Sequence, residues 1–194
     1  AGTENRYVGV RCGIMDQLTA SSGRAGHALL LDCRSLEISY VAMPAELAVV
    51  VMDTGVRRSL SASEYNERRE SCERTVAALR ARDPSVRALR DVSRVQLDAN
   101  ADLMDPRTLR RAQHVVEEMT RPAAMREALA SGDFARAGTL MNASHSSLRD
   151  LYEVSSVHLD MACECARARA ACYGARLTGA GFGGCASALV RAPE

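Results

Sequence analysis

The sequence predicts an α+β fold in which a strand-rich segment, residues 1–60, precedes a helix-rich segment, residues 61–194. Three observations support this expectation. Apolar runs before Gly55 have the spacing of strands, apolar residues from Ser63 onward recur with helical spacing, and two strand-like runs enclose a glycine loop near the C-terminus. The first segment offers few partners for its apolar run at 47–52. We therefore expect it to be the remnant of an incomplete mixed sheet.

The first segment predicts one short helix and three strands. The first two strands form a hairpin, because a short polar link, residues 33–36, separates them. The third is a continuous apolar run, which suits a strand that is buried on both faces. In chain order, the expected elements are a helix from Asp16 to Ser22 that Gly23 ends, and strands at 27–32, 37–41 and 47–52.

The second segment predicts several helices and a closing pair of strands. Ser63 and Asp133 can each cap a helix, because their side-chain oxygens accept hydrogen bonds from free backbone N–H groups. A polar stretch follows at 86–105, to which we assign no helix or strand. In chain order, the expected elements are helices from Ser63 to the Asp83–Pro84 break, from about 106 to 119, at 123–130, 134–151 and 157–172, and strands at 175–178 and 185–190.

Composition argues against several classes of partner. The formal net charge is +1, from 25 basic residues that are all arginine and 24 acidic residues, so no field would gather nucleic acid or an anionic membrane. No apolar run approaches the roughly 20 residues that span a bilayer, and the polar start at 1–7 does not resemble a signal peptide. Seven cysteines, an odd number, favour reduced thiols in the cytoplasm. The chain does not begin with methionine, and we expect it to be a fragment.

Two groupings of reactive side chains are better explained as structural. Cys163 and Cys165 would point roughly 200° apart on a helix, so with His158 and Cys172 they would not converge on one metal ion. The run Ser144–Ser146 could suggest a hydrolase, but adjacent positions on a helix diverge and no nucleophile elbow is present. Neither grouping therefore predicts catalysis.

Asp16 is the first candidate catalytic residue. It follows a glycine turn at Gly13 and stands where a helix should begin, and there the helix dipole and free N–H groups favour an ionised carboxylate. Such a carboxylate within reach of a hydroxyl can accept its proton or orient it for attack. The alternative is an aspartate that caps the helix, and spacing alone favours that interpretation.

The glycine loop is the second candidate. Gly179, Gly181 and Gly184 satisfy the G-x-G-x-x-G spacing of dinucleotide-binding proteins. That class also needs a helix directly after the glycines and an acidic residue about 20 positions on. Here a strand-like run follows, and we reject that interpretation. The glycines instead indicate a loop whose small residues allow the backbone to approach a cleft closely.

Four segments occur in the order of the motifs of one enzyme family: Cys12–Gln17, Ser63–Glu73, His145–Ser155 and Gly174–Cys185. Together they resemble the galactokinases, which belong to the GHMP superfamily of small-molecule kinases. The first segment, Cys-Gly-Ile-Met-Asp-Gln, resembles the galactokinase signature more than that of the N-acetylgalactosamine kinases. The last segment resembles the third, C-terminal motif of the superfamily.

The resemblance implies a role for each matching residue. Asp16 falls on the catalytic aspartate that acts on the anomeric hydroxyl, and Gly13 and Tyr65 fall on residues that contact the sugar. Glu4 falls on the acidic ligand of the Mg²⁺ that bridges the ATP phosphates. Without the family, Glu4 would be a solvated surface acid and Tyr65 a tyrosine at the rim of the core. The loop beside the active site falls on Gly179, Ala180, Gly181, Phe182 and Gly183, with Ala180 in place of a usual glycine.

The implied function is ATP-dependent phosphorylation of galactose to galactose 1-phosphate, with ATP and Mg²⁺ as cofactors. The family's N-terminal signature and its phosphate loop have no counterpart in this sequence. We therefore expect a partial copy that is inactive alone and whose partner is the missing N-terminal half of the same enzyme. In this interpretation, residues 1–60 end the N-terminal kinase domain and residues 61–194 form the GHMP C-terminal domain. The alternatives are an inactive fragment and a GHMP-fold sensor that binds sugar and nucleotide without turnover.

Overall fold

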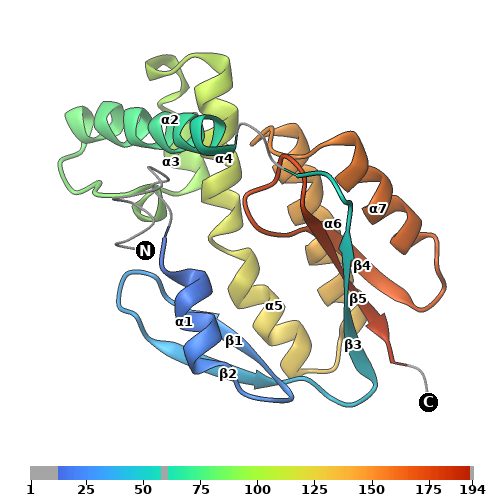
Figure 1. Ribbon diagram of the computed structural model, residues 1–194. Coiled ribbons are helices and arrows are strands. Elements are labelled where there is room, and N and C mark those ends of the chain that lie inside the picture. The colour runs from blue at the N-terminus through green and yellow to red at the C-terminus, as the bar shows by residue number, and fades with distance from the viewer. Residues whose placement is uncertain (1–12, 58–60, 193–194) are drawn as a thin grey trace.

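The structure is a computed structural model that describes residues 13–57 and 61–192. It confirms the α+β class, with helices packed beside a hairpin and a separate sheet (Figure 1). The helices are α1 (Met15–Ser22), α2 (Ser61–Arg82), α3 (Arg94–Asp98), α4 (Pro106–Glu118), α5 (Arg121–Ala130), α6 (Phe134–Asp150) and α7 (Val157–Arg167), with 3-10 turns η2 (Leu89–Asp91) and η3 (Ala101–Leu103). The strands are β1 (His27–Leu31), β2 (Ile38–Ala42), β3 (Leu47–Asp53), β4 (Cys172–Leu177) and β5 (Cys185–Arg191).

The predicted hairpin is confirmed, since β1 and β2 pair antiparallel. Asp32 builds its turn, because its carboxylate accepts hydrogen bonds from the backbone N–H groups of Arg34 and Ser35, at 2.7 and 3.2 Å. The same carboxylate binds the guanidinium of Arg90 in η2, at 2.7 and 2.8 Å. This ion pair joins the hairpin to the helical part of the molecule.

The second sheet has the order β3-β5-β4, and both pairings are antiparallel. Leu47 and Leu189 pack against α5 and α6 on one face, whereas Ala186 and Ala188 pack in the cluster that includes Leu159 of α7. Because β3 pairs with β5, the sheet contains strands from both sides of the boundary expected near residue 60. The division into 1–60 and 61–194 stays a prediction.

The expectation that 47–52 is buried on both faces is wrong for the part of the chain that the structure describes. β3 is the edge strand of its sheet, and Val49, Val50 and Val51 are 56%, 43% and 64% exposed. Leu47 at the start of the strand is buried. The apolar run thus forms a strand, as predicted, but its central valines stay exposed and packing reaches only Leu47 and Met52, near its two ends, among the described residues.

Several expected boundaries differ from the structure: β4 spans Cys172–Leu177 instead of 175–178, and α5 begins at Arg121 instead of 123. α2 begins at Ser61, two residues before the expected cap at Ser63, which is within the usual uncertainty of a helix end. α7 ends at Arg167 instead of 172, because the backbone turns before Cys172 begins β4. The polar stretch at 86–105, to which the sequence assigned no element, holds η2, α3 and η3. Leu89, Val92 and Leu97 of this stretch are buried, at spacings too uneven to predict a helix.

Among the residues that the structure describes, no helix is both long enough and apolar enough to cross a membrane.

Candidate functional site

The glycine loop between β4 and β5 has an unusual backbone. Gly179, Gly181, Gly183 and Gly184 have φ angles of 75°, 81°, 135° and 77°, and Phe182 has a φ of 62°. Residues with a side chain rarely adopt these positive φ angles, which explains why most residues of the loop are glycine. Ala180 is not among the residues with positive φ, so the alanine that replaces a usual glycine is compatible with the fold.

Two other segments hold the loop in place. The N–H of Phe182 donates to the carbonyl oxygen of Val154 at 2.7 Å, and the N–H of Gly184 donates to that of Val56 at 3.0 Å. The carbonyl oxygen of Gly184 accepts the Thr54 hydroxyl at 2.7 Å. A Cβ atom at Gly181 would lie 2.1 Å from the oxygen of Val154, so no side chain fits there.

The loop leaves donors available for a ligand. Within the described chain, the backbone N–H groups of Gly179, Ala180, Gly181 and Gly183 have no hydrogen-bond acceptor. Successive N–H groups in such a mixed backbone form a concavity that suits anions. A pocket of about 480 Å³ lies at the end of the loop, lined by Asp53, Gly55, Val56, Arg57, Gly184 and Cys185. The arrangement can bind a phosphate or hydroxyl oxygen.

Tyr65 lies in the first turns of α2, on the part of the helix that meets the glycine loop. Arg68, one turn further on, places its guanidinium 5.0 Å from the centre of the Phe182 ring. Burial, then the Cys72 thiol and the Tyr65 phenol, raise the pKa of Tyr152, which indicates that the two tyrosines are neighbours. The structure thus brings Tyr65 and the glycine loop to one region.

Asp16 and Gly13 lie in a different part of the molecule. Asp16 is exposed in the first turn of α1, and the residue at the cap position is Ile14, so the alternative that Asp16 caps the helix is wrong. No hydrogen bond or ion pair of its carboxylate occurs among the described residues. Figure 1 shows α1 beside the hairpin and away from the loop between β4 and β5. The structure therefore does not bring Asp16 to Tyr65, and Glu4 lies outside the described residues.

The cysteines of α7 and the run Ser144–Ser146, for which the sequence predicted structural roles, have separate partners in the structure. Cys163 is buried and Cys165 is exposed on α7, as diverging positions require. The hydroxyl of Ser144 donates to Glu118 at 2.6 Å, whereas Nδ1 of His145 accepts the N–H of Leu177 at 3.2 Å. These contacts hold helices and strand together, and they do not form a catalytic triad.

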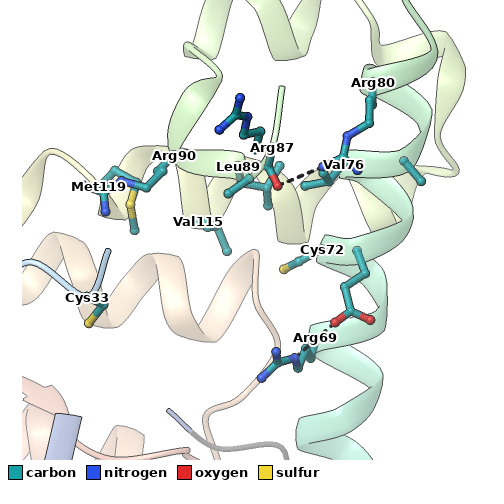
Figure 2. Close-up of a pocket in the computed structure, with 13 residues that line it drawn as sticks. Cys33, Arg69, Cys72, Val76, Arg80, Arg87, Leu89, Arg90, Val115 and Met119 are labelled. Atoms are coloured by element: carbon teal, nitrogen blue, oxygen red, sulfur yellow. Dashed lines mark hydrogen bonds and ion pairs between the residues drawn. The ribbon is translucent and has the colours of Figure 1, made fainter. Parts of the chain in front are cut away.

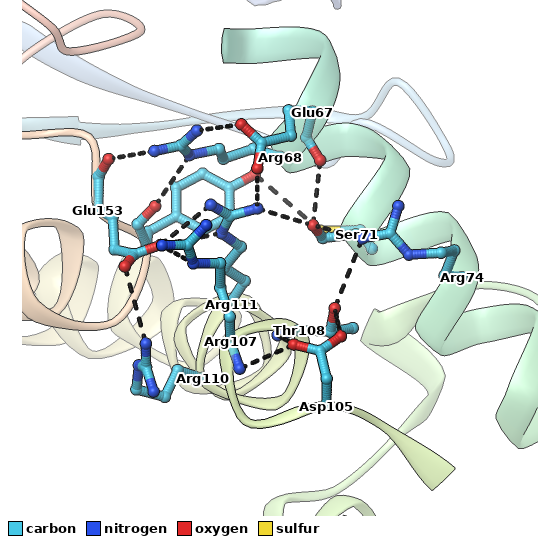
Figure 3. A network of polar contacts seen from close by, with 12 residues as sticks. Glu67, Arg68, Ser71, Arg74, Asp105, Arg107, Thr108, Arg110, Arg111 and Glu153 are labelled. Atoms are coloured by element: carbon cyan, nitrogen blue, oxygen red, sulfur yellow. Dashed lines mark hydrogen bonds and ion pairs between the residues drawn. The ribbon is translucent and has the colours of Figure 1, made fainter.

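Sequence reasoning missed a polar network between α2, α4 and the chain after α6 (Figure 3). It contains the buried guanidinium groups of Arg68 and Arg111 and the carboxylates of Glu67 and Glu153. The local sequence did not indicate this network, because arginine and glutamate in a helix most often lie on its solvated face. Only the tertiary structure brings these charges together and buries the two guanidinium groups.

A further pocket, of about 670 Å³, lies between α2, η2 and α4 (Figure 2). Leu89, Val115 and Met119 give it an apolar wall, and Arg80 and Arg87 stand at its side. Arg80 donates to the carbonyl oxygens of Val86 and Arg87, so it stabilises the chain around η2. None of the predicted site residues lines this pocket.

Comparison with known proteins identifies the class to which this fold and loop belong. Residues 125–194 match the family described as GHMP kinases C terminal. The chain therefore carries a GHMP kinase C-terminal domain, and this match includes the whole glycine loop. The resemblance to the GHMP superfamily that the sequence motifs indicated is confirmed.

Within that superfamily, the relatives are galactokinases. The chain is 52% identical to galactokinase of Roseiflexus sp. (strain RS-1) and 48% identical to galactokinase of Bos taurus, in each case over 97% of this chain. The crystal structure of Lactococcus lactis galactokinase complexed with galactose superposes with a TM-score of 0.91 at 40% identity, over 97% of this chain. The chain spans about half the length of these relatives, 48%, 47% and 49% respectively.

Proposed function

We propose that this chain supplies the C-terminal half of a galactokinase, which transfers a phosphoryl group from ATP to the anomeric hydroxyl of galactose. The observation that carries the proposal is 52% identity to a galactokinase over 97% of the chain, together with the close structural match to a galactokinase that binds galactose. The chain spans about half of these proteins, so the partner in the proposal is an N-terminal galactokinase half.

In this proposal, Asp16 is the residue that acts on the sugar hydroxyl. Its carboxylate is exposed in the first turn of α1, where a ligand can reach it. An ionised carboxylate can take the proton of the attacking hydroxyl or orient it. Gly13, just before the helix, would contact the sugar through its backbone, and Tyr65 through its hydroxyl. Binding of the N-terminal half would have to complete the site around α1 and α2.

The glycine loop is proposed to contact ATP. The uncommitted N–H groups of Gly179, Ala180, Gly181 and Gly183 suit phosphate oxygens, and Arg57 adds a positive charge to the adjoining pocket. ATP supplies the phosphoryl group, and Mg²⁺ would neutralise charge on its phosphates. Glu4 is the proposed ligand for Mg²⁺, because a hard cation prefers carboxylate oxygen. A cytoplasmic location completes the proposal, supported by the free thiols of the six described cysteines.

The test combines this chain with the N-terminal half of the Roseiflexus galactokinase. We expect galactose-dependent ATP consumption by the pair and none by the chain alone. Asp16→Asn keeps the size of the side chain but cannot accept a proton, so it should lower kcat by about 10²-fold or more while galactose binding survives. Glu4→Gln should instead raise the Mg²⁺ concentration that activity needs.

Asp102→Asn is the matched control, because Asp102 is exposed and, among the described residues, its carboxylate is bound in a surface ion pair with Arg82. Its effect on kcat should stay below about 2-fold. Near-normal turnover by Asp16→Asn would remove Asp16 from its role. Galactose binding by the assembled protein without any ATP consumption would favour the sensor alternative instead.

A further inference from the structure

The segment Tyr152–Val154, just after the end of α6, joins the glycine loop to the helical part of the molecule. The carbonyl oxygen of Val154 accepts the N–H of Phe182 at 2.7 Å, and Gly181 passes directly over it. The N–H of Val154 in turn donates to Leu148 of α6. Any shift of this segment must therefore move the loop.

The backbone of this segment is held in an uncommon conformation. Glu153 has a φ of 58°, a left-handed value that is unfavourable for a residue with a side chain. Phe182, on the other side of the contact, has a φ of 62°, which is unfavourable for the same reason. Such conformations persist where surrounding contacts determine them, and they gather at functional sites.

Arg68 of α2 supplies contacts to both strained residues. Its Nε donates to the carbonyl oxygen of Tyr152 at 3.2 Å, and its Nη2 donates to that of Glu153 at 2.6 Å. Its guanidinium plane lies 5.0 Å from the Phe182 ring centre, a cation–π distance. Only 9% of the side chain is exposed. A single buried side chain thus contacts the supporting segment and the loop together.

The side chain of Glu153 is held independently by α4. Arg111, with 3% of its side chain exposed, donates to Glu153 through two nitrogens, at 3.0 and 3.3 Å. Arg111 also binds Glu67 and the hydroxyl of Ser71 on α2, at 3.0 and 2.9 Å. Glu67 completes the network by pairing with Arg68 (Figure 3). The two guanidinium groups are buried, whereas the Glu67 and Glu153 side chains are 46% and 30% exposed, so removing either carboxylate leaves a buried guanidinium with fewer partners.

We propose that Arg68 and the Arg111–Glu153 pair are positioning residues, which set the backbone of the glycine loop through the 152–154 segment. The network fixes where the Val154 oxygen lies, and this oxygen fixes Phe182 and the free N–H groups beside it. The catalytic consequence rests on the proposed function, because these N–H groups are the proposed contact to ATP. The structural consequence does not depend on it.

The first test measures amide hydrogen exchange of the whole chain by mass spectrometry, with peptides that cover 178–185. Arg68→Gln removes the guanidinium contacts, and we expect the hydrogen-bonded N–H groups of Phe182 and Gly184 in these peptides to exchange about 10-fold faster, while peptides from α4 and β5 keep their rates. Arg82→Gln is the matched control, since it removes an exposed arginine ion pair on the same helix and should leave the loop unchanged. Unchanged exchange in Arg68→Gln would overturn the proposal.

A second variant covers the case in which Arg68→Gln does not fold. Glu153→Asn removes the carboxylate contacts to α4, but asparagine tolerates the left-handed backbone at this position. It should accelerate exchange of the same peptides. An acceleration that is equal in every helix would mean a general loss of stability and would contradict a positioning role.

The kinetic test uses the chain assembled with the N-terminal galactokinase half. Because a small displacement of a contact is costly, Arg68→Gln should lower kcat/KM for ATP by about 10-fold or more, while the KM for galactose changes less than about 3-fold. Arg68→Lys should restore little, because lysine lacks the planar fork. An equal loss for both substrates would contradict the proposal. If the unaltered assembly is inactive, the proposed function fails, and the exchange measurement still decides the positioning role.

Discussion

His114 lies in the core between α4 and α6, where its ring stacks on Tyr152 with centroids 4.5 Å apart. Its Nδ1 atom lies 2.9 Å from the hydroxyl of Ser147. Burial lowers the pKa of His114 to about 4; the Glu118 carboxylate opposes this shift and Arg121 adds to it. The residue is therefore neutral in the native protein at neutral pH.

This pKa predicts how stability depends on pH. In the unfolded chain, His114 binds a proton below about pH 6.5. In the folded chain, it binds a proton only below about pH 4. The free energy of unfolding should therefore be unaffected by His114 above pH 6.5. It should fall as the pH drops from 6.5 to 4, by on the order of 3 kcal/mol from this residue. Urea unfolding at a series of pH values measures the change.

The variant His114→Gln should flatten this part of the pH profile, although its stability at pH 7 will be lower. His158→Gln is the control, because His158 is exposed on α7 and its replacement should leave the profile as it is. A profile for His114→Gln that keeps its full slope would show that other groups cause it. His145, whose pKa is also lowered by burial, would be the next residue to replace.

The sequence offers Asp16 and the loop glycines as candidate site residues because their motifs are contiguous, and these assignments stay predictions. Arg68 and Glu153 could not be predicted, because they are 85 positions apart and meet only through the fold. The left-handed φ of Glu153 is also invisible in the sequence, where a glutamate after a helix suggests a solvated side chain. Contacts between residues far apart in the chain are therefore harder to predict than contiguous motifs.

At the scale of elements, α6 and β4 approach each other unusually closely. Gly138 of α6 faces Gly174 of β4, and a Cβ atom at Gly138 would lie 1.9 Å from the carbonyl oxygen of Tyr173. A Cβ atom at Gly174 would lie 2.1 Å from the oxygen of Gly138. The two glycines thus let helix and strand touch through their backbones, close to the core around Leu189.

The substitution Gly138→Ala has two opposing effects on the free energy of unfolding. Alanine favours the helix interior over glycine by about 1 kcal/mol. The steric effect should win, because the obstacle is backbone and overpacking of this kind costs about 1–3 kcal/mol or more. We expect a net loss of stability, measured as a lower urea midpoint.

Thr139→Ala, on the exposed side of the same helix, provides the control and should be neutral or slightly stabilising. A variant Gly138→Ala that is as stable as the parent would mean that α6 can move away from β4 at little cost.

Sequence patterns predicted the long elements best. Asp133 caps α6 as expected, accepting the N–H of Arg136, and the hairpin turn forms at Asp32. Both depend on local hydrogen bonds that a few neighbouring residues define. The short helix α3 was missed, although Ser93 and Gln96 form a capping box at its start. A five-residue helix has too few positions for a periodic pattern.

At the scale of the whole molecule, the described chain leaves an apolar surface beside one edge of its sheet. Val49 and Val51 lie on one face of β3 and Val50 on the other, and they are 56%, 64% and 43% exposed. Within the described residues, β3 pairs only with β5, so its second edge offers free backbone groups (Figure 1). Exposed apolar edge strands are sites of association.

We predict that the chain alone self-associates or binds a hydrophobic dye through this strand. Val51→Lys places a charge on the most exposed of the three valines and should reduce both effects. Light scattering and dye fluorescence at matched concentrations measure the difference. Val157→Lys is the control, because Val157 is 67% exposed at the start of α7, away from the sheet edge, and its replacement should change neither signal.

The same surface links this prediction to the proposed function. If an N-terminal galactokinase half covers β3, adding that half should lower dye binding by the parent chain and leave the already low signal of Val51→Lys nearly unchanged. A monodisperse chain that binds no dye on its own would contradict the prediction. In that case, the exposed valines of β3 would not cause association, and this strand would not need a second half to cover it.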